Sequence, residues 1–224
     1  GIECAHAVTT VSPTYSRELH DAWYAYGLEG ILRARSGKMT GILNGIDVDV
    51  YDPSKDPHIA KNYDADNFSG KAECKAALQK ELGLPQNPDV PIIAMVTRLA
   101  SHKGLELVHY VFDELLQHDV QVVILGSGEA DYERFFHQKC AQYQGKFAFY
   151  RGFVPALAHR IYAGADIFLM PSQSEPCGLA QMVALRYGTI PIVRQTGGLN
   201  DTITDSGDNK GNGFTFSSYN AHDM

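Results

Sequence analysis

The residues best suited to chemistry stand in loops that follow short apolar runs. Arg98 and Lys103 lie five positions apart, directly after the apolar run 92–97. A guanidinium donates two parallel hydrogen bonds and an ammonium is a compact charge, so together they suit a diphosphate. A helix is expected to begin after Lys103, and helix N-termini favour anions as well. An exposed basic loop that binds nothing is the alternative that these residues leave open.

A single carboxylate follows another apolar run, 166–170. Glu175 stands between a strand end and a helix start, within the sequence Ser-Glu-Pro-Cys-Gly-Leu of residues 174–179. An ionised Glu in this place can accept hydrogen bonds from sugar hydroxyls, whereas the alternative is that it only caps the helix. The first backbone amides of that helix are unpaired donors. They belong to Cys177, Gly178 and Leu179.

Two glycine-rich loops complete the set. The sequence Gly126-Ser-Gly128 follows the apolar run 120–125, and Thr196-Gly197-Gly198 follows the run 190–193. Glycine allows backbone amides to approach a nucleotide or a phosphate closely, and ordinary tight turns are the alternative. The first loop has Asp131 where a dinucleotide fingerprint would have its third glycine, which disfavours a dehydrogenase.

The cysteines and histidines form no pattern that binds a metal. None of the 4 cysteines forms a CxxC pair, and the 9 histidines include no HExxH sequence. We therefore expect reduced thiols in a reducing compartment, no metal site and no cofactor. The sequence also lacks a P-loop and a nucleophile elbow.

Composition disfavours two classes of partner. The 224 residues carry 19 Lys and Arg against 26 Asp and Glu, a formal net charge of −7, which argues against nucleic acid. Hydrophobic residues make up 44% of the chain, so we expect a buried core. The longest apolar runs are far shorter than the ~20 residues that cross a bilayer, and no signal peptide is visible, so no membrane partner is expected.

From about residue 90 onward, apolar runs of strand length alternate with helical patterns. The runs are apolar throughout, which is typical of strands buried on both faces of a parallel sheet. The sequence therefore predicts an α/β fold with a doubly wound, Rossmann-like parallel sheet over about residues 90–216. Ligands bind beyond the carboxyl ends of such strands, where the loops described above would lie. Strands are expected at 92–97, 120–125, 147–150, 166–170 and 190–193, and helices at 71–81, 105–116, 130–144, 157–163 and 178–187.

The first part of the chain differs in pattern. A short strand is expected first, then a helix from Pro13 capped by Ser12. The segment 47–67 is polar and irregular, so we place a domain boundary there. Residues 1–45 are predicted to be the tail and hinge of another domain, packed as an appendage, and residues 46–224 to form an incomplete nucleotide-binding domain. Because the chain starts without Met and ends without a closing element, we expect a piece of a longer protein.

Six motifs in this order mark a known family. The chain resembles the bacterial glycogen synthases and the related plant starch synthases, from about Val8 to the end. The resemblance implies the GT-B architecture of two Rossmann-like domains, of which this chain carries the C-terminal, donor-binding one. The motifs are Thr14–Glu18, Gly27–Arg33, Asn44–Asp47, Arg98 with Lys103–Leu105, Ser174–Leu179 and Thr196–Leu199.

The resemblance also implies an activity. Glucose would pass from ADP-glucose or UDP-glucose to the 4-hydroxyl at the non-reducing end of an α-1,4-glucan, with retention of configuration. The glucan acceptor would bind mainly to the N-terminal domain, which is missing here, so the isolated fragment is expected to be inactive. The enzyme would work in the cytoplasm, or in a plastid if it comes from a plant or alga.

The resemblance assigns roles to particular residues. Arg98 and Lys103 would stabilise the diphosphate leaving group without a metal, and Glu175 would lie near the 3- and 4-hydroxyls of glucose. Phe153 matches a position that is often Tyr and stacks on the nucleobase; a place in the core is the alternative. Val183 stands where the broader superfamily has a second Glu. The remaining donor contacts would be the amides of Cys177, Gly178 and Leu179 on the sugar, and Thr196, Gly197 and Gly198 near the phosphates.

Two other functions remain open. One is another GT-B enzyme, such as sucrose synthase or a sugar-nucleotide epimerase, which the sequence around Glu175 disfavours. The other is a nucleotide-binding module without catalysis.

Overall fold

The core of the protein is a parallel β-sheet. The structure, a computed structural model, describes residues 1–207 and 209–224. Within these residues, six strands lie in the order β5-β4-β3-β6-β7-β8, and all neighbouring pairs are parallel. Their bounds are β3 Ile92–Val96, β4 Gln121–Gly126, β5 Phe147–Arg151, β6 Ile167–Met170, β7 Ile190–Arg194 and β8 Phe214–Phe216. The predicted doubly wound parallel sheet is confirmed, with β8 as an additional edge strand.

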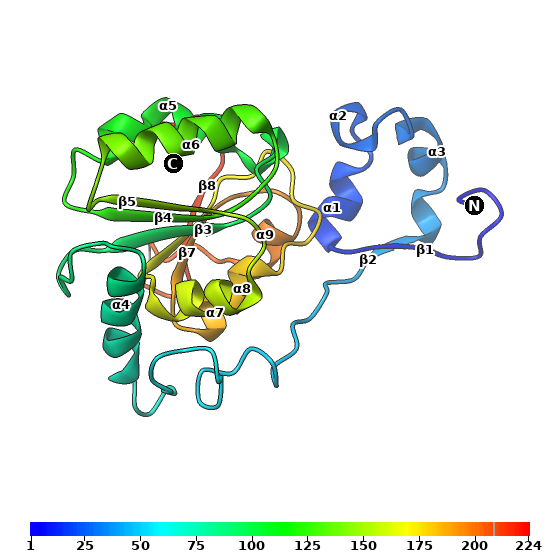
Figure 1. Ribbon diagram of the computed structural model, residues 1–224. Helices are drawn as coiled ribbons and strands as arrows, with labels where there is room; N and C mark the ends of the chain where they lie inside the picture. Colours follow the sequence, from blue (N-terminus) through cyan, green and yellow to red (C-terminus); the bar gives the residue numbers. More distant parts are fainter. Residues whose placement is uncertain (208) are drawn as a thin grey trace.

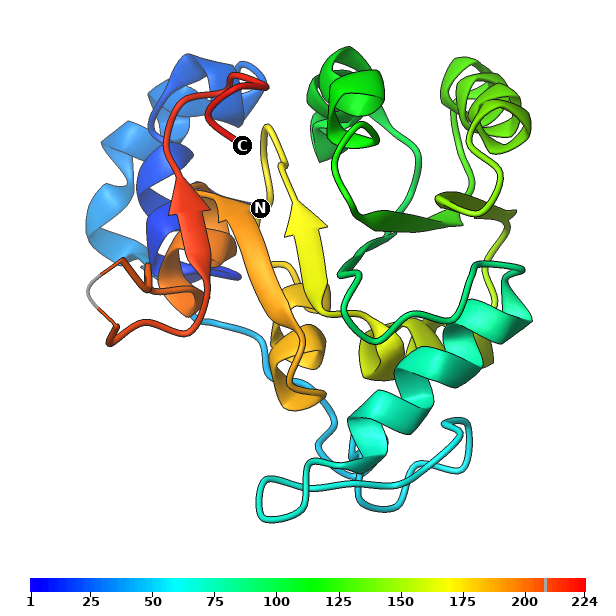
Figure 2. The ribbon, with the colours of Figure 1, turned by 90° about the vertical axis from the view of Figure 1, so that its left-hand side faces the viewer.

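The chain builds the sheet outward in two directions from its centre. β3, β4 and β5 follow one another toward one edge, and β6, β7 and β8 follow one another toward the other. Figure 2 shows the second half of the sheet side by side, in yellow, orange and red. β3 therefore pairs with both β4 and β6, with Val96 opposite Leu125 and Ile93 opposite Ile167. Successive strands are added toward one edge from β3 and toward the other edge from β6, and this switch point between β3 and β6 is where an open α/β sheet has room for a ligand.

Helices cover both faces of the sheet, as Figure 1 shows. One face carries α5 (Leu105–Leu115) and α6 (Ala130–Gln142), and the other carries α4 (Gly70–Glu81), α7 (Pro155–Gly164) and α8 (Ala180–Arg186). Neighbouring residues of one strand enter different layers: Ala94 packs on the α4 and α7 side, and Met95 on the α5 and α6 side. This burial on both faces explains why the strands are apolar throughout.

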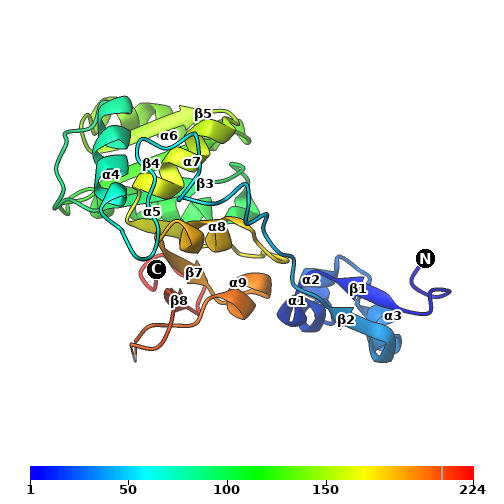
Figure 3. The same cartoon turned by 90° about the horizontal axis from the view of Figure 1, so that it is seen from below.

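Residues 1–41 form a small unit at the N-terminus. Its elements are β1 Val8–Thr10, α1 Pro13–Glu18, α2 Ala22–Ala25, α3 Glu29–Ala34, the 3-10 turn η1 Ser36–Lys38 and β2 Met39–Gly41. The predicted cap of α1 is confirmed, because the Ser12 hydroxyl accepts a hydrogen bond from the Tyr15 amide at 2.8 Å. Figures 1 and 3 show the unit beside the body, joined by the extended segment 42–47 and in contact through α1 and α9 (Gly197–Thr202). The domain border at residue 45 stays a prediction.

The irregular segment 47–67 is fixed to the body by a buried polar cluster. One oxygen of the fully buried Asp56 side chain accepts from the Tyr187 hydroxyl at 2.5 Å and lies 2.7 Å from Nδ1 of His159. Tyr51 stacks on the His159 ring, with centroids 5.1 Å apart. Burial raises the pKa of Asp56, but hydrogen bonds from Tyr187, a backbone amide and His159 outweigh it, so the pKa is lowered. Asp56 therefore stays charged inside the protein and anchors the segment.

Three further features bear on the expected class of protein. All four cysteines are free thiols. In the described ranges, no helix combines the length and apolar character needed to cross a bilayer. No group of three or more His, Cys, Asp or Glu side chains in those ranges is placed to hold a metal ion.

A buried lysine links α4 to the ends of the strands. Lys71 Nζ donates to the Thr189 hydroxyl at 2.8 Å and to the carbonyls of Ala163 and Tyr187 at 3.0 and 3.1 Å. Burial lowers the pKa of this ammonium from 10.5 to about 8. Between these two values the unfolded chain keeps the proton that the folded chain has released. The contribution of Lys71 to stability therefore improves as the pH rises through this window.

We predict that the stability of the wild type rises relative to that of Lys71→Met as the pH increases from about 7.5 to about 9.5. The difference between their free energies of unfolding should grow by up to ~1.4 kcal/mol per pH unit above pH ~8. In this range the unfolded wild type binds one proton more than the folded wild type, and the variant lacks the group that binds it. Urea unfolding of both proteins at several pH values measures this difference. A difference that does not change with pH would show that Lys71 titrates normally.

Candidate functional site

Lys103 and Glu175 form an ion pair at the switch point of the sheet. The 3-10 turn η2 (Ser101–Lys103) follows β3, and Glu175 lies in the loop after β6. Nζ of Lys103 is 2.6 Å from Oε2 of Glu175, and the two side chains are 18% and 9% exposed. The structure thus brings together two residues that the sequence carries in separate loops. Side by side, they can hold a phosphate group and a sugar hydroxyl at neighbouring positions.

Close backbone contact holds the two loops at this distance. The Gln173 amide donates to the His102 carbonyl at 2.9 Å, which bonds the loop after β6 to η2. Gly104 has a φ of +75°, and a Cβ atom at this position would lie 1.9 Å from the carbonyl oxygen of Pro171. Any other residue at 104 would clash with that backbone and push Lys103 away from Glu175.

A cavity of about 310 Å³ lies at the carboxyl ends of β3 and β4. Four residues predicted to bind the donor are among those that line it: Arg98, Gly126, Phe153 and Leu179. Phe153 is 86% exposed, so the alternative that it belongs to the core is wrong. Its ring is free to stack on a nucleobase.

Tyr51 lines the same cavity and was missed by sequence reasoning. It reaches the cavity from the irregular segment, where it stacks on His159. An aromatic side chain in a polar segment was the available signal, and such side chains are too common to assign a role. Val183 of α8 also lines the cavity, so the position of the superfamily's second Glu faces this space with an uncharged side chain.

The glycines after β4 allow two loops to pack closely. A Cβ atom on Gly126 would lie 2.0 Å from the Thr97 carbonyl oxygen, and one on Gly128 would lie 2.2 Å from that of Leu99. The Gly128 amide already donates to Glu133 at 3.0 Å. Close packing therefore accounts for both glycines, and their contact with a nucleotide stays a prediction.

The loop after β6 presents backbone donors. The amides of Cys177, Gly178 and Leu179 make no hydrogen bond to any part of the chain that the structure describes. Cys177 is buried, so its thiol is not exposed to solvent. Gly178 has a φ of +73°, a conformation that turns the chain into α8 and that suits glycine. The sequence predicts that the helix begins at Gly178, but α8 begins at Ala180, so these donors lie directly before the helix rather than in its first turn. Their contact with a sugar stays a prediction.

The Thr-Gly-Gly loop after β7 is occupied by the protein itself. Glu18 of α1 accepts hydrogen bonds from the Gly197 amide at 2.9 Å and from the Thr196 hydroxyl at 3.0 Å. The Gly198 amide donates to the backbone carbonyl of Glu175 at 3.1 Å. The Gly197 amide and the Thr196 hydroxyl are thus held by an internal carboxylate. A role near the donor phosphates stays a prediction.

The loop after β3 contributes two cations, Arg98 and Lys103, to this end of the sheet. Arg98 is exposed and lines the cavity, while Lys103 is largely buried in the ion pair. Burial, followed by the charges of Lys103 and Arg98, lowers the pKa of His102. The His102 ring is therefore neutral at neutral pH and adds no third cation.

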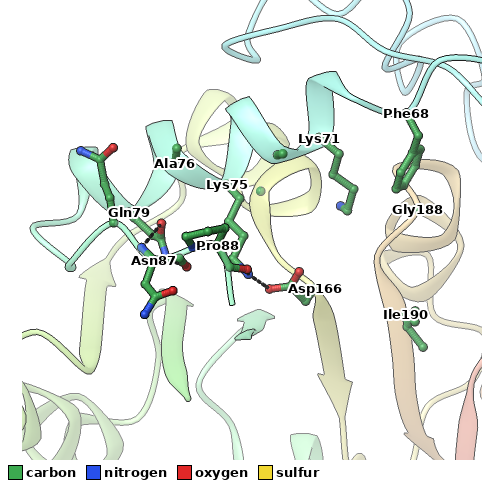
Figure 4. Close-up of a pocket in the computed structure, with 13 residues that line it drawn as sticks. Phe68, Lys71, Lys75, Ala76, Gln79, Asn87, Pro88, Asp166, Gly188 and Ile190 are labelled. Atoms are coloured by element: carbon green, nitrogen blue, oxygen red, sulfur yellow. Dashed lines mark hydrogen bonds and ion pairs between the residues drawn. The ribbon is translucent and has the colours of Figure 1, made fainter. Parts of the chain in front are cut away.

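A larger cavity, of about 560 Å³, lies at the opposite end of the strands, their amino ends (Figure 4). It opens between α4 and the amino ends of the strands, where Lys75 pairs with Asp166 at 2.9 Å. Lys71, which also lines it, donates to protein oxygens. The charged groups of this cavity are thus satisfied by the protein, and none of the predicted site residues lines it. We therefore place the candidate functional site at the carboxyl ends of the strands.

Comparison with known proteins identifies the family. The family model described as "Glycosyl transferases group 1" matches residues 79–224, more than half of the chain. The model described as "Starch synthase catalytic domain" matches residues 1–34. The chain belongs to the group 1 glycosyl transferases.

This glycosyltransferase chain is similar in sequence to bacterial glycogen synthases. It is 52% identical over 226 residues to the glycogen synthase of Bacillus cereus, which covers 100% of the chain and 48% of the relative. It is 54% identical over 219 residues to that of Geobacillus thermodenitrificans, with 97% and 45% covered. The chain spans about half the length of the curated relatives it matches. The resemblance noted from the sequence is confirmed.

Two solved structures share its fold. The catalytic domain of starch synthase IV from Arabidopsis thaliana, bound to ADP and acarbose, is 40% identical with a TM-score of 0.92, covering 98% of this chain and 46% of that chain. HepE of Anabaena in complex with UDP and glucose is 18% identical with a TM-score of 0.66, covering 98% and 51%. Residues 1–41 are 41 of 224, or about 18%. A score of 0.92 therefore requires that this unit superposes together with the body.

We predict that Lys103 and Glu175 are energetically coupled. Lys103→Ala or Glu175→Ala leaves one charge without its partner in a mostly buried place, so the double variant should lose less stability than the sum of the single variants. We expect a coupling energy of about 1–3 kcal/mol, measured by urea unfolding of the four proteins. The exposed pair of Arg134 and Asp131 provides the control cycle, with an expected coupling below about 0.5 kcal/mol. Additive effects at Lys103 and Glu175 would contradict the pairing.

Proposed function

We propose that this chain is the donor-binding half of a glucosyltransferase that extends an α-1,4-glucan. In this proposal, glucose passes from a nucleoside diphosphate to the 4-hydroxyl at the non-reducing end of the glucan, with retention of configuration. Two findings support it: curated relatives named glycogen synthase, and similarity to a starch synthase bound to ADP and acarbose. From the bacterial relatives we also expect a cytoplasmic enzyme.

One observation carries the proposal: two loops each connect the cavity with the ion pair. The loop after β3 has Arg98 in the cavity wall and Lys103 in the ion pair, and the loop after β6 has Leu179 in the wall and Glu175 in the pair. A nucleoside diphosphate sugar has its parts in the same order. We therefore assign the base to the cavity with Phe153, the diphosphate to the two cations and the glucose to Glu175.

The proposed chemistry follows from where charge develops. As the bond between the anomeric carbon and the diphosphate oxygen breaks, negative charge grows on the leaving group beside Arg98 and Lys103, which stabilise it. Positive charge grows on the glucose ring, so hydroxyls that donate to Glu175 become better donors and this contact strengthens in the transition state. The two cations supply the charge that a metal ion supplies in other transferases.

The other side of the cleft is expected to lie outside this chain. Because the chain spans about half the length of its relatives, we propose that the glucan binds mainly to the remaining part and that this chain alone transfers no glucose. The close superposition on the structure with ADP and acarbose supports the inference that residues 1–41 and the body have their substrate-bound arrangement.

We propose ADP-glucose as the first donor to test, with UDP-glucose as the second. The more similar solved structure, at 40% identity, is bound to ADP. The structure bound to UDP and glucose is 18% identical and informs on the fold alone.

We predict that Lys103→Ala weakens the binding of ADP to the chain by ~1.5–3 kcal/mol, or about 10- to 150-fold, because a hydrogen bond to a charged group is lost. Isothermal titration calorimetry measures this. Adenosine, which has no phosphates, should bind both proteins equally. The exposed Lys80, on α4, provides the control Lys80→Ala, which should not change ADP binding.

Three results would contradict the proposed function. Equal ADP affinity in the wild type and Lys103→Ala would remove Lys103 from the diphosphate site. Loss of binding on addition of EDTA would replace the cation pair by a bound metal ion. Tighter binding of NAD than of ADP and UDP would favour a dinucleotide-binding protein instead.

A further inference from the structure

Two carboxylates bond helix α1 of the N-terminal unit to helix α9 of the body. Asp201, on α9, accepts from the Thr14 amide at 2.8 Å and from the Thr14 hydroxyl at 2.6 Å. Glu18, the last residue of α1, accepts from the Gly197 amide at 2.9 Å and from the Thr196 hydroxyl at 3.0 Å. Figures 1 and 3 show the two helices adjacent to each other. The unit therefore contacts the body through directed hydrogen bonds.

The contact is reciprocal. Each helix places a carboxylate from its C-terminal end against the first turn of the other, so the two run antiparallel. First-turn amides have no partner within their own helix, and the N-terminal end of a helix favours negative charge. Each carboxylate thus satisfies one such amide. Sliding α1 along α9 would break both contacts at once, so the pair fixes a single register.

Helix α9 passes this constraint to the loop that carries Glu175. The Gly198 amide donates to the Glu175 carbonyl at 3.1 Å. A Cβ atom on Gly197 would lie 1.9 Å from the same carbonyl oxygen, and one on Gly198 would lie 2.1 Å from the Cys177 carbonyl oxygen. The backbone of α9 therefore packs directly on the backbone of the loop. A displacement of α9 must move that loop as well.

We propose that Glu18 and Asp201 are positioning residues for the glucosyl transfer. They hold residues 1–41 against the body in one orientation and, through α9, they hold the loop of Glu175 in place. The catalytic part of this proposal rests on the function proposed above, whereas the coupling between the two helices does not.

The second oxygen of the Glu18 carboxylate makes glutamine a suitable conservative substitution. Oε2 of Glu18 is buried and has no hydrogen-bond partner in the part of the chain that the structure describes. Both contacts to α9 use Oε1. A glutamine keeps an acceptor oxygen in the position of Oε1 and changes only the atom in the position of Oε2. Glu18→Gln should therefore preserve the contact that Glu18→Ala removes. The matched control is Glu3→Ala, because Glu3 pairs with Arg35 inside the same N-terminal unit.

Amide hydrogen exchange in this chain, followed residue by residue by NMR, tests the coupling. Glu18→Ala should speed exchange at the Gly197 amide at least about tenfold, and also at the Thr14 amide, whose own partner Asp201 is intact. Asp201→Ala should act reciprocally on Gly197, while Glu18→Gln and Glu3→Ala should change neither amide by more than about threefold. Faster exchange confined to the amide that lost its partner would overturn the proposed coupling.

Kinetics of the full-length enzyme test the catalytic role. Glu18→Ala should lower kcat about 10- to 100-fold with less than about a threefold change in KM for the donor, because the loss is one of orientation. Glu18→Gln should restore kcat. An unchanged kcat in Glu18→Ala, with a wild type that elongates glucan, would overturn the positioning role and leave the proposed function intact. A wild type that transfers glucose from neither donor would overturn the proposed function together with this role, and hydrogen exchange would still decide the coupling.

Discussion

The ion pair between Lys103 and Glu175 joins the two halves of the sheet at the switch point, where the order of strand addition reverses. A largely buried ion pair is maintained only if both charges stay close and well oriented, because the desolvation cost of an unpaired charge is several kcal/mol. Here the orientation is set by backbone contacts, since Gly104 brings the turn after β3 against the carbonyl of Pro171. The cavity and the remaining donors are arranged around this fixed point.

The constraint extends outward through further contacts between backbones. The loop of Glu175 packs on the first turn of α9, and α9 bonds to α1 of the N-terminal unit. Three loops and one helix of a separate unit therefore share one arrangement at the carboxyl edge. The opposite edge has its own buried lysines, but their partners are carbonyls, a hydroxyl and a carboxylate of the protein. Charge at that end holds the structure together, whereas Arg98 at the carboxyl ends of the strands is exposed and lines the cavity.

Much of the fold and part of the site could be predicted from the sequence. Strands that are apolar throughout indicate burial on both faces, and this pattern is local, so the sheet and the loops at its carboxyl ends follow from it. Arg98, Lys103 and Glu175 could be named because few residue types hold diphosphates and sugars. The occupant of the Thr196–Gly198 loop could not be predicted, because Glu18 lies some 180 positions away and its position depends on packing between two units. Tyr51 could not be assigned a role because an aromatic side chain in a polar segment is too common a signal, and its stacking partner His159 is distant in sequence.

A crystal structure of this chain with bound ADP tests the central claim most directly. The account predicts that the diphosphate lies within hydrogen-bond distance of both Arg98 and Lys103, with the adenine in the cavity beside Phe153 and Tyr51. ADP bound between α4 and the amino ends of the strands, or at the carboxyl edge with its phosphates away from Lys103, would contradict it.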